Sequence, residues 1–300
     1  MVVTHGSFKP SRGRTALTIG NFDGVHRGHR ALVDRVTAKA AELQVTSCVL
    51  TFEPHPREFF AAAAAPARIT RLRDKLALLE AAGMQRVHVA RFDARFAALT
   101  AARFVEEVLK QGLGARWLLV GRDFLFGAKR AGDFAALQGR GFELEAIADV
   151  QFEGSRVSSS AVRDALARGD LRGAEALLGH PYAISGRVAH GAKLGRSLGF
   201  PTANIVLRRP PPLSGIFAVD AGAFGRGVAS VGRRPTVNPV PVPLLEVHLF
   251  DCDRDLYGEH LSVRFLEKLR DEEKFDDLER LREAIAGDVR RAREYFARHG

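Results

Sequence analysis

The two halves of the chain differ in how their hydrophobic residues are spaced. In the first half, short apolar runs alternate with segments in which apolar residues recur every three or four positions, which predicts strands alternating with helices. The predicted strands are residues 16–19, 46–52, 87–90, 117–120 and 144–147, and predicted helices include 32–40, 72–82, 101–111 and 171–178. This alternation predicts an α/β domain with a parallel, doubly wound sheet.

Beyond residue 181 the helical spacing stops, and short β-prone segments separated by Gly and Pro follow. The predicted strands are 182–188, 205–207, 215–219, 227–231, 244–250 and 261–266. About six short strands of this kind suit a small closed or partly closed antiparallel barrel. Residues 275–296 then form one amphipathic helix, expected to cover the barrel. We therefore predict two domains, residues 1–182 and 183–300, the second being a β-barrel with a long C-terminal helix.

Composition narrows the class of protein. A chain of 300 residues is long enough for two hydrophobic cores, and 46% hydrophobic with 27% charged residues is ordinary for a soluble protein. No apolar run approaches the length of a membrane span, and residues 1–14 lack the apolar core of a secretion signal. Cys48 and Cys252 lie far apart in the sequence, so we expect neither a disulfide framework nor a cysteine metal site, and we expect a cytoplasmic location.

The net charge of +10 raises the question of nucleic-acid binding. Many arginines, however, stand singly on the polar faces of alanine-rich helices, as Arg163, Arg168 and Arg172 do. No basic run is interleaved with aromatic residues. We therefore expect neither a nucleic-acid partner nor a membrane partner, while a homo-oligomer stays possible and is not readable from the sequence.

The turn after the first strand carries the first candidate site. It reads GNFDGVHRGH over residues 20–29 and leads into a helix, whose N-terminal N–H groups can bind phosphate. His26 and His29 are three residues apart and can share one face, so both imidazoles could donate to charge that develops on an α-phosphate. Gly28 lets a phosphate approach the backbone. The alternative is a pair of surface histidines at a helix cap.

Three further segments place polar side chains where strands end or helices begin. His55 lies between two prolines on a rigid turn after strand 46–52. Asp123 follows strand 117–120, and capping a turn is its alternative role. Ser159 and Ser160 precede a helix, where hydroxyls and free N–H groups form an anion cradle, and Arg163 can fork onto phosphate oxygens. Plain helix capping is the alternative for the serines.

In the second half, residues 191–204 (GAKLGRSLGFPTAN) form a glycine-rich basic loop suited to phosphates. Thr202 and Asn204 alternate with Ala203, and neutral oxygens of this kind suit a magnesium ion bridging ATP phosphates. The run is not the G-x-x-x-x-G-K-[ST] phosphate loop, which excludes a general P-loop kinase. A glycine-rich surface loop is the alternative.

Glu246 is a single carboxylate on the hydrophobic strand 244–250. If it points inward, it must be paired or functional, and it could take the proton of a primary hydroxyl that attacks the γ-phosphate of ATP. If it points outward, it is an ordinary solvated strand residue.

Residues 20–29 resemble the H-x-G-H nucleotidyltransferase superfamily and, more narrowly, the adenylyltransferase half of bacterial bifunctional riboflavin kinase/FAD synthetases. The F-x-P-H-P run at 52–56, the G-x-D-F-x-F-G run at 121–127 and the S-S-S-x-V-R run at 158–163 match the same family. The second half resembles riboflavin kinase through P-T-A-N at 201–204, E-V-H-L-F-D at 246–251 and R-D-E-E-K-F at 270–275. Departures are the proline-rich residues 237–243 and Cys252, which stands where a large apolar residue is usual.

The resemblance implies two activities, ATP-dependent phosphorylation of riboflavin to FMN and adenylyl transfer from ATP to FMN, with Mg²⁺ accompanying ATP. In the adenylyl transfer the FMN phosphate would attack the α-phosphorus directly, and His26, His29 and Arg163 would stabilise the transition state. Glu246 would be the general base of the kinase. The implied ATP or phosphate ligands of the adenylyltransferase are Asn21, Gly28, Asp123, Ser159 and Ser160. The implied ATP or flavin ligands of the kinase are Gly191, Lys193, Gly195, Arg196, Thr202, Asn204 and Arg270. Thr202 and Asn204 would also bind the metal.

Two rival functions stand beside this one. In the first, only one domain is an enzyme and the other is a regulatory binding module, although the intact H-x-G-H and P-T-A-N runs argue against it. In the second, the chain is a basic RNA-binding or regulatory protein that senses flavin. Turnover on both substrates would separate an enzyme from a sensor.

Overall fold

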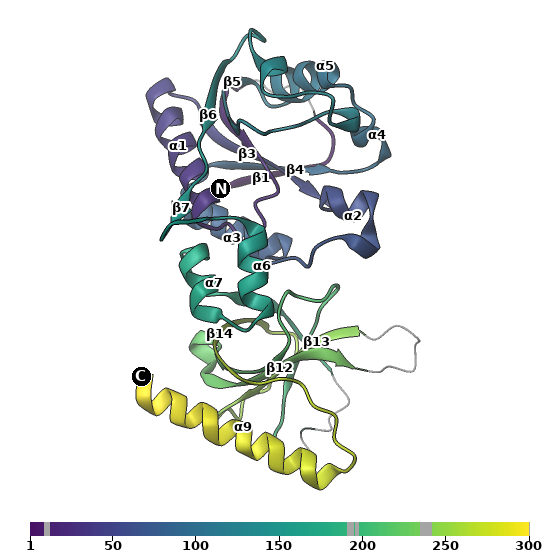
Figure 1. Ribbon diagram of the computed structural model, residues 1–300, viewed down its shortest axis with the longest axis vertical. Helices are drawn as coiled ribbons and strands as arrows, with labels where there is room; N and C mark the ends of the chain where they lie inside the picture. The colour runs from purple at the N-terminus through teal and green to yellow at the C-terminus, as the bar shows by residue number, and fades with distance from the viewer. Residues whose placement is uncertain (9–12, 191–194, 196–197, 235–241, 300) are drawn as a thin grey trace. The chain divides into compact units, whose positions relative to one another are not determined.

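A computed structural model describes residues 1–8, 13–190, 195, 198–234 and 242–299 (Figure 1). The chain forms two compact units, one of residues 1–66 and 72–158, the other of residues 67–71 and 159–300. In the part of the chain that the structure describes, no helix combines the length and apolar character needed to cross a membrane.

The first unit is built on a six-stranded sheet in which every neighbouring pair is parallel. In sheet order the strands are β1 (Val2–His5), β4 (Arg86–Arg91), β3 (Thr46–Glu53), β2 (Thr15–Ile19), β5 (Ala115–Gly121) and β6 (Glu143–Ile147). The doubly wound α/β prediction is therefore confirmed. The sequence pattern did not reveal β1, because this short edge strand is partly exposed and lacks a continuous apolar run.

Helices cover both faces of this sheet, since alternate side chains of each strand point to opposite faces. On one face, Ala16, Val49 and Val87 form a core with Val33 and Val36 of the helix α1 (Arg27–Leu43). The remaining helical segments are α2 (Pro56–Phe60), η1 (Ala62–Ala64), α3 (Leu72–Ala81), α4 (Ala94–Ala97), α5 (Ala101–Arg103), the π-helix η2 (Phe104–Gly112), η3 (Ala128–Arg130) and η4 (Ala135–Leu137). A small hairpin joins β7 (Gln151–Phe152) to β8 (Ser155–Arg156).

The opposite face of the sheet carries a second core. Leu17, Leu50 and Leu118 pack there with Phe104 and Val108 of η2. Burial on both faces explains why β2, β3 and β5 read as near-continuous apolar runs in the sequence.

The second unit contains a closed antiparallel barrel of six strands, as predicted. Around the barrel the strands are β10 (Ala203–Val206), β13 (Val242–Leu249), β12 (Arg226–Arg234), β11 (Gly215–Asp220), β14 (His260–Arg270) and β9 (Ala183–Ala189). The helices of this unit whose bounds the structure describes are α6 (Ser159–Ala167), α7 (Leu171–Leu178), η5 (Gly222–Phe224) and α9 (Leu278–His299). Figure 1 shows α9, in yellow, running along the barrel.

Helices α6 and α7 pack with the barrel, whereas the sequence assigned them to the first domain. Val162, Leu166 and Leu178 of these helices share one hydrophobic core with Ile184 and Val263 of the barrel strands. The boundary near residue 182 therefore stays a prediction about which fragment can fold and act by itself.

The C-terminal helix α9 begins at Leu278 rather than at Phe275. The physical reason is Asp277, whose side chain accepts a hydrogen bond from the backbone N–H of Arg280 at 2.8 Å and so caps the helix. Ala292 and Phe296 of α9 pack against Ile216 and Val228 on the outer wall of the barrel. The predicted covering role of this helix is thus observed.

Candidate active sites

The turn between β2 and α1 brings His26 and His29 together. His26 is the N-cap of α1, and its Nδ1 accepts a hydrogen bond from the backbone N–H of His29 at 3.3 Å. The two imidazole rings stack with centroids 3.7 Å apart and planes 16° apart. Since Nδ1 of His26 is an acceptor, its proton in the neutral form resides on Nε2. The sequence therefore places two adjacent imidazoles at a helix N-terminus.

Gly28 packs closely against this pair of rings. A Cβ at position 28 would lie 3.2 Å from the His26 ring and 3.6 Å from the carbonyl oxygen of Val157. The contact with the ring is tight, so a side chain at position 28 would oblige the His26 ring to shift by a few tenths of an ångström. This close approach adds to the role predicted from the sequence, that glycine leaves the backbone open to phosphate.

His29 is held as a neutral imidazole. Burial lowers its pKa well below the ordinary value, and the nearby His26 and Lys75 lower it further. Its Nδ1 is buried and, among the described residues, has no hydrogen-bond partner, and the same is true of Oδ1 of Asn21. Buried polar atoms without partners are rare in folded proteins, so both atoms indicate a polar ligand in this turn.

Two neighbouring strands add polar residues at the same edge of the sheet. His55 follows β3 and caps α2, where its Nδ1 accepts from the backbone N–H of Arg57 at 3.1 Å. Asp123 follows β5, and its exposed carboxylate lies 3.9 Å from the guanidinium of Arg156. Because β3 and β5 flank β2, the carboxyl edge of the sheet collects these side chains around the histidine turn.

This unit also carries an exposed aromatic cluster that the sequence pattern did not predict. The rings of Phe59, Phe60 and Phe92 meet edge to face with centroids 5.1 to 5.7 Å apart, and Phe52 and Phe96 extend the group. Phe60 is 68% exposed and Phe59 is 39% exposed, which is unusual for phenylalanine. The available signal was the pair of adjacent phenylalanines three residues after the end of the F-x-P-H-P run.

Ser159, Ser160 and Arg163 belong to the second unit. Helix α6 begins at Ser159, so Ser159 and Ser160 lie in its first turn rather than before it, as the sequence had suggested. Nε of Arg163 donates to the carbonyl of Ala67 at 2.7 Å. Their role as ATP-phosphate ligands remains a prediction.

The glycine-rich loop of the second unit is described only in part. Gly191, Lys193 and Arg196 lie outside the described residues. At Gly195 a Cβ would lie 2.4 Å from the carbonyl oxygen of Phe200, so glycine alone fits there. The same two residues are joined by a hydrogen bond of 2.7 Å from the N–H of Phe200 to the carbonyl of Gly195.

Two cavities in the barrel unit have Thr202 in common. The first, of about 300 Å³, has Val188, Val247, Leu249 and Tyr257 in its lining. The second, of about 190 Å³, lies between the barrel wall and α9, with Ser230, Glu246 and Arg270 on the barrel side and Leu281, Ile285 and Asp288 on the helix side.

Glu246 matches neither orientation considered from the sequence. Its neighbours Leu245 and Val247 are fully buried in the barrel core, so Glu246 points away from that core. It does not face open solvent either, because the half-buried carboxylate lines the second cavity. In the strand registers it lies opposite Asn204 and Ser230, which places all three on one face.

Asn204 supplies an oxygen suited to a metal ion. Its Nδ2 donates to the carbonyl of Thr202 at 3.2 Å, whereas its buried Oδ1 has no hydrogen-bond partner among the described residues. A neutral oxygen without a partner fits Mg²⁺, which prefers hard oxygen ligands.

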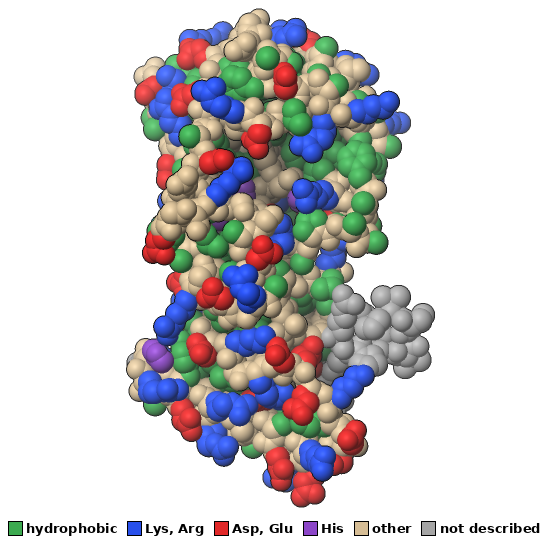
Figure 2. All heavy atoms as spheres, viewed as in Figure 1, with side chains coloured by type: hydrophobic (Ala, Val, Ile, Leu, Met, Phe, Trp, Pro, Cys, Tyr) green, Lys and Arg blue, Asp and Glu red, His purple; other side chains and the backbone are tan. Residues whose placement is uncertain are grey.

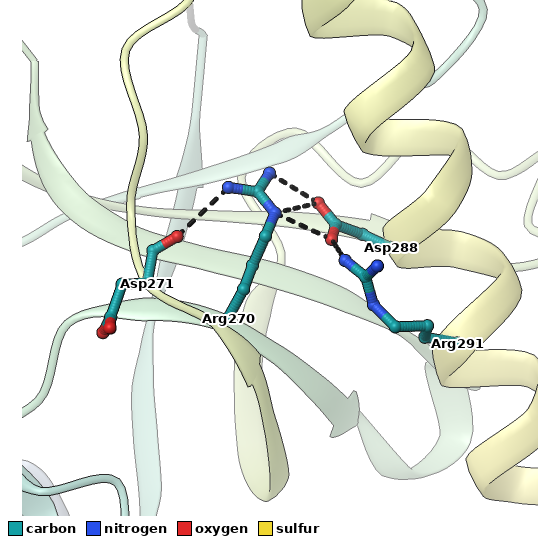
Figure 3. Close-up of polar contacts among 4 residues, drawn as sticks. All are labelled: Arg270, Asp271, Asp288 and Arg291. Atoms are coloured by element: carbon teal, nitrogen blue, oxygen red, sulfur yellow. Dashed lines mark hydrogen bonds and ion pairs between the residues drawn. The ribbon is translucent and has the colours of Figure 1, made fainter.

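Arg270 is held by two residues that the sequence analysis did not single out (Figure 3). Its Nε and Nη2 donate to the carboxylate of Asp288 at 2.9 and 2.7 Å, and its Nη1 donates to the carbonyl of Asp271 at 3.1 Å. Glu272 also lines this cavity, and its pKa is raised by partial desolvation and by the nearby Glu246, although the residue as a whole is exposed.

The comparisons with known proteins cover both units. The family model of FAD synthetase matches residues 8–161, and that of riboflavin kinase matches residues 178–296. The bifunctional riboflavin kinase/FMN adenylyltransferase of Escherichia coli (strain K12) is 49% identical over 289 residues, covering 93% of this chain and 92% of the relative. The Pseudomonas fluorescens protein of the same name is 48% identical over 299 residues, covering 97% and 96%.

A solved structure shares the whole fold. The crystal structure described as a macrolide-efflux protein from Streptococcus pneumoniae aligns with a TM-score of 0.80 and 28% identity, covering 98% of this chain and 99% of that one. Both family models and the relatives near 50% identity agree on one assignment. The chain belongs to the family of bifunctional riboflavin kinase/FMN adenylyltransferases.

Proposed function

We propose that this chain catalyses two successive steps of flavin cofactor synthesis, phosphorylation of riboflavin by ATP and adenylyl transfer from ATP to FMN. The observation that supports this most directly is that each family model falls on a segment with its own candidate site, the histidine turn in one and the Glu246 cavity in the other. Two separate sites suit two reactions that attack different phosphorus atoms of ATP.

In the kinase reaction, Glu246 takes the proton of the primary hydroxyl of riboflavin while that oxygen attacks the γ-phosphorus. The bond from the γ-phosphorus to its bridging oxygen breaks, and ADP leaves. The cavity that contains Glu246 also has apolar lining from Phe275, Leu281 and Ile285, which suits the flavin ring. ATP occupies the first cavity, so Thr202, common to both cavities, lies where the phosphates meet the hydroxyl.

Mg²⁺ fits the oxygens of Thr202 and Asn204. When bound there, it would neutralise phosphate charge during transfer. Gly191, Lys193, Gly195 and Arg196 are assigned to ATP or flavin binding from the sequence match, and Arg270 from that match together with its place in the cavity wall.

In the adenylyl transfer, a phosphate oxygen of FMN attacks the α-phosphorus of ATP and pyrophosphate leaves. This nucleophile is already an anion, so the step needs no general base. A neutral His29 and Nε2 of His26 donate hydrogen bonds to charge that develops on the α-phosphate. The exposed rings of Phe59 and Phe60 offer apolar faces on which the flavin can stack.

The remaining assignments in the adenylyltransferase rest on the sequence match and on position at the sheet edge. Asn21, Gly28 and Asp123 contact ATP, and Ser159, Ser160 and Arg163 bind its phosphates. We further propose a cytoplasmic enzyme with its kinase function in residues 183–300 and its adenylyltransferase function in residues 1–182.

The deciding experiment is incubation of the purified protein with riboflavin, ATP and magnesium, with flavins separated by chromatography. We expect FMN to appear first and FAD to follow, and FAD to form directly from supplied FMN. Formation of only one product would favour an enzyme with one regulatory domain. Flavin binding without turnover would favour a sensor.

A further inference from the structure

The C-terminal helix α9 is anchored to the barrel along only part of its length. Its buried residues are Asp288, Ala292 and Phe296, which recur every four positions and so share one face. Ala292 and Phe296 pack in a hydrophobic cluster with residues of β11 and β12. In residues 278–287, all of which the structure describes, no residue is buried. Asp288 is therefore the first anchor along the helix.

The cavity that contains Glu246 borders the part of α9 before this anchor. Leu281 and Ile285 line the cavity from the helix side together with Asp288, and Glu246 and Arg270 line it from the barrel side. The two walls belong to different elements of the chain. The width of the cavity therefore depends on the contacts that join α9 to the barrel.

Asp288 makes such a contact through its charge. The residue is only 2% exposed, and a carboxylate buried to this extent is costly unless cations and hydrogen bonds compensate it. Nε and Nη2 of Arg270, on β14, donate to its two oxygens at 2.9 and 2.7 Å (Figure 3). Arg291 of α9 adds a second ion pair from the same helix. A two-pronged pair of this kind fixes direction as well as distance.

Arg270 is itself held on the barrel side. Its Nη1 donates to the carbonyl of Asp271 at 3.1 Å, and its guanidinium carbon lies 5.6 Å from the centroid of the Phe275 ring. Each of the three guanidinium nitrogens thus has an acceptor, which leaves the planar group little freedom to turn. Arg270 and Asp288 together form a rigid connection between β14 and α9.

We propose that Asp288 is a positioning residue of the kinase, whose pair with Arg270 is a latch that seats the first half of α9 and so sets the width of the flavin cavity. This inference rests on the proposed function, which places the flavin ring against Leu281 and Ile285. The latch touches no reacting atom. A wall held in place beforehand spares riboflavin the cost of ordering it, so the latch acts on riboflavin binding.

The test is Asp288→Asn in the full chain, a change that keeps the shape of the side chain and removes its charge. FMN formation is measured at saturating ATP and magnesium while riboflavin is varied. We expect KM for riboflavin to rise about tenfold with kcat within about twofold of wild type, because a loss of binding common to the ground and transition states changes KM alone. The Kd of riboflavin, measured by flavin fluorescence, should rise with KM. FAD formation from supplied FMN should stay at the wild-type rate.

Two further variants test whether the effect comes from the latch. Asp288→Glu keeps the carboxylate and should recover most of the wild-type KM. Arg270→Lys keeps the positive charge but loses the fork, so it should also raise KM and spare kcat. Because the two residues act as one unit, Asp288→Asn/Arg270→Lys should raise KM no further than the stronger single variant does. Arg270→Lys leaves no buried charge without a counter-ion, so it decides the question if Asp288→Asn does not fold.

Arg293→Gln is the matched control. Arg293 also joins α9 to the barrel unit, through an ion pair with Asp251 at 3.1 Å. Both of these side chains are more than half exposed, and Arg293 follows the anchored position 288. Its loss should leave the KM for riboflavin unchanged.

Two results would overturn the inference. One is an unchanged KM for riboflavin in folded Asp288→Asn, or in Arg270→Lys if the first variant does not fold. The other is a double variant in which the effects of the two single changes multiply, since independent contacts behave in that way. A wild-type protein that makes no FMN would instead refute the proposed function.

Discussion

The histidine turn of the first unit and the Glu246 cavity of the second are assembled in different ways. His26, Gly28 and His29 lie within four residues of one turn, and a single helix N-cap fixes their geometry. The Glu246 cavity takes side chains from β12, β13, the end of β14 and α9. The comparison teaches that a site made by one turn depends on local conformation, whereas a site made by several elements depends on how they pack.

We expect the largest loss of activity when the proposed general base in the Glu246 cavity is removed. Glu246→Gln keeps the shape of the side chain and removes the proton acceptor. Riboflavin phosphorylation should fall by about 10² to 10⁴ because a general base contributes that much. FAD formation from supplied FMN should remain near wild type, as measured by chromatography. Full kinase activity in this variant would defeat the assignment of the base.

We expect the second-largest loss of activity from substitutions in the histidine turn. His26→Ala or His29→Ala removes a donor to the developing phosphate charge, a loss of roughly 3 kcal/mol, or about 10² to 10³ in FAD formation. FMN formation from riboflavin should persist and serves as the internal control. Unchanged FAD synthesis in both variants would contradict the role of the turn.

A smaller effect tests whether local geometry alone sets the turn. Gly28→Ala places a Cβ 3.2 Å from the His26 ring and should disturb the stacked pair. We expect FAD formation to fall about tenfold, since small displacements of catalytic groups are costly. Gly13→Ala is the matched control, because a Cβ there meets nothing within 4 Å. Equal activity in the two variants would show that the ring stacking is dispensable.

The smallest effect is a dependence of the stability of the first unit on pH. The pKa values of His29 and His88 are lowered mainly by burial, so the unfolded chain binds protons more readily than the folded one. The stabilisation from the neutral rings is complete above the unfolded pKa of about 6.5 and is lost as the pH falls below it.

Trp117 makes this effect measurable, because it is the single tryptophan of the chain and is 2% exposed in the first unit. Its fluorescence should report a melting temperature that decreases from pH 7 to pH 5. The decrease should be smaller in His29→Gln, which has no proton to gain. An identical pH dependence in that variant would rule out His29 as a source.

The sequence by itself determined both architectures and the histidine turn. Runs buried on both faces, such as Leu17 in β2 and Leu50 in β3, require a covered parallel sheet, and alternation such as Leu245, Glu246 and Val247 requires a barrel wall with two different faces. The turn was readable because its contacts join residues three apart, and such spacing is visible in a linear string.

Tertiary structure decided where the side chains at these positions meet. Strand alternation predicts that Glu246 and Leu245 face opposite sides of the barrel wall. The packing of α9 against that wall decides that Glu246 lines a cavity rather than facing open solvent. Phe60 and Phe92 lie in separate segments of the chain, and Arg270 and Asp288 lie in a strand and a helix. Such contacts leave no periodic signal, because the free energy that selects them comes from packing between elements and from compensating a buried charge.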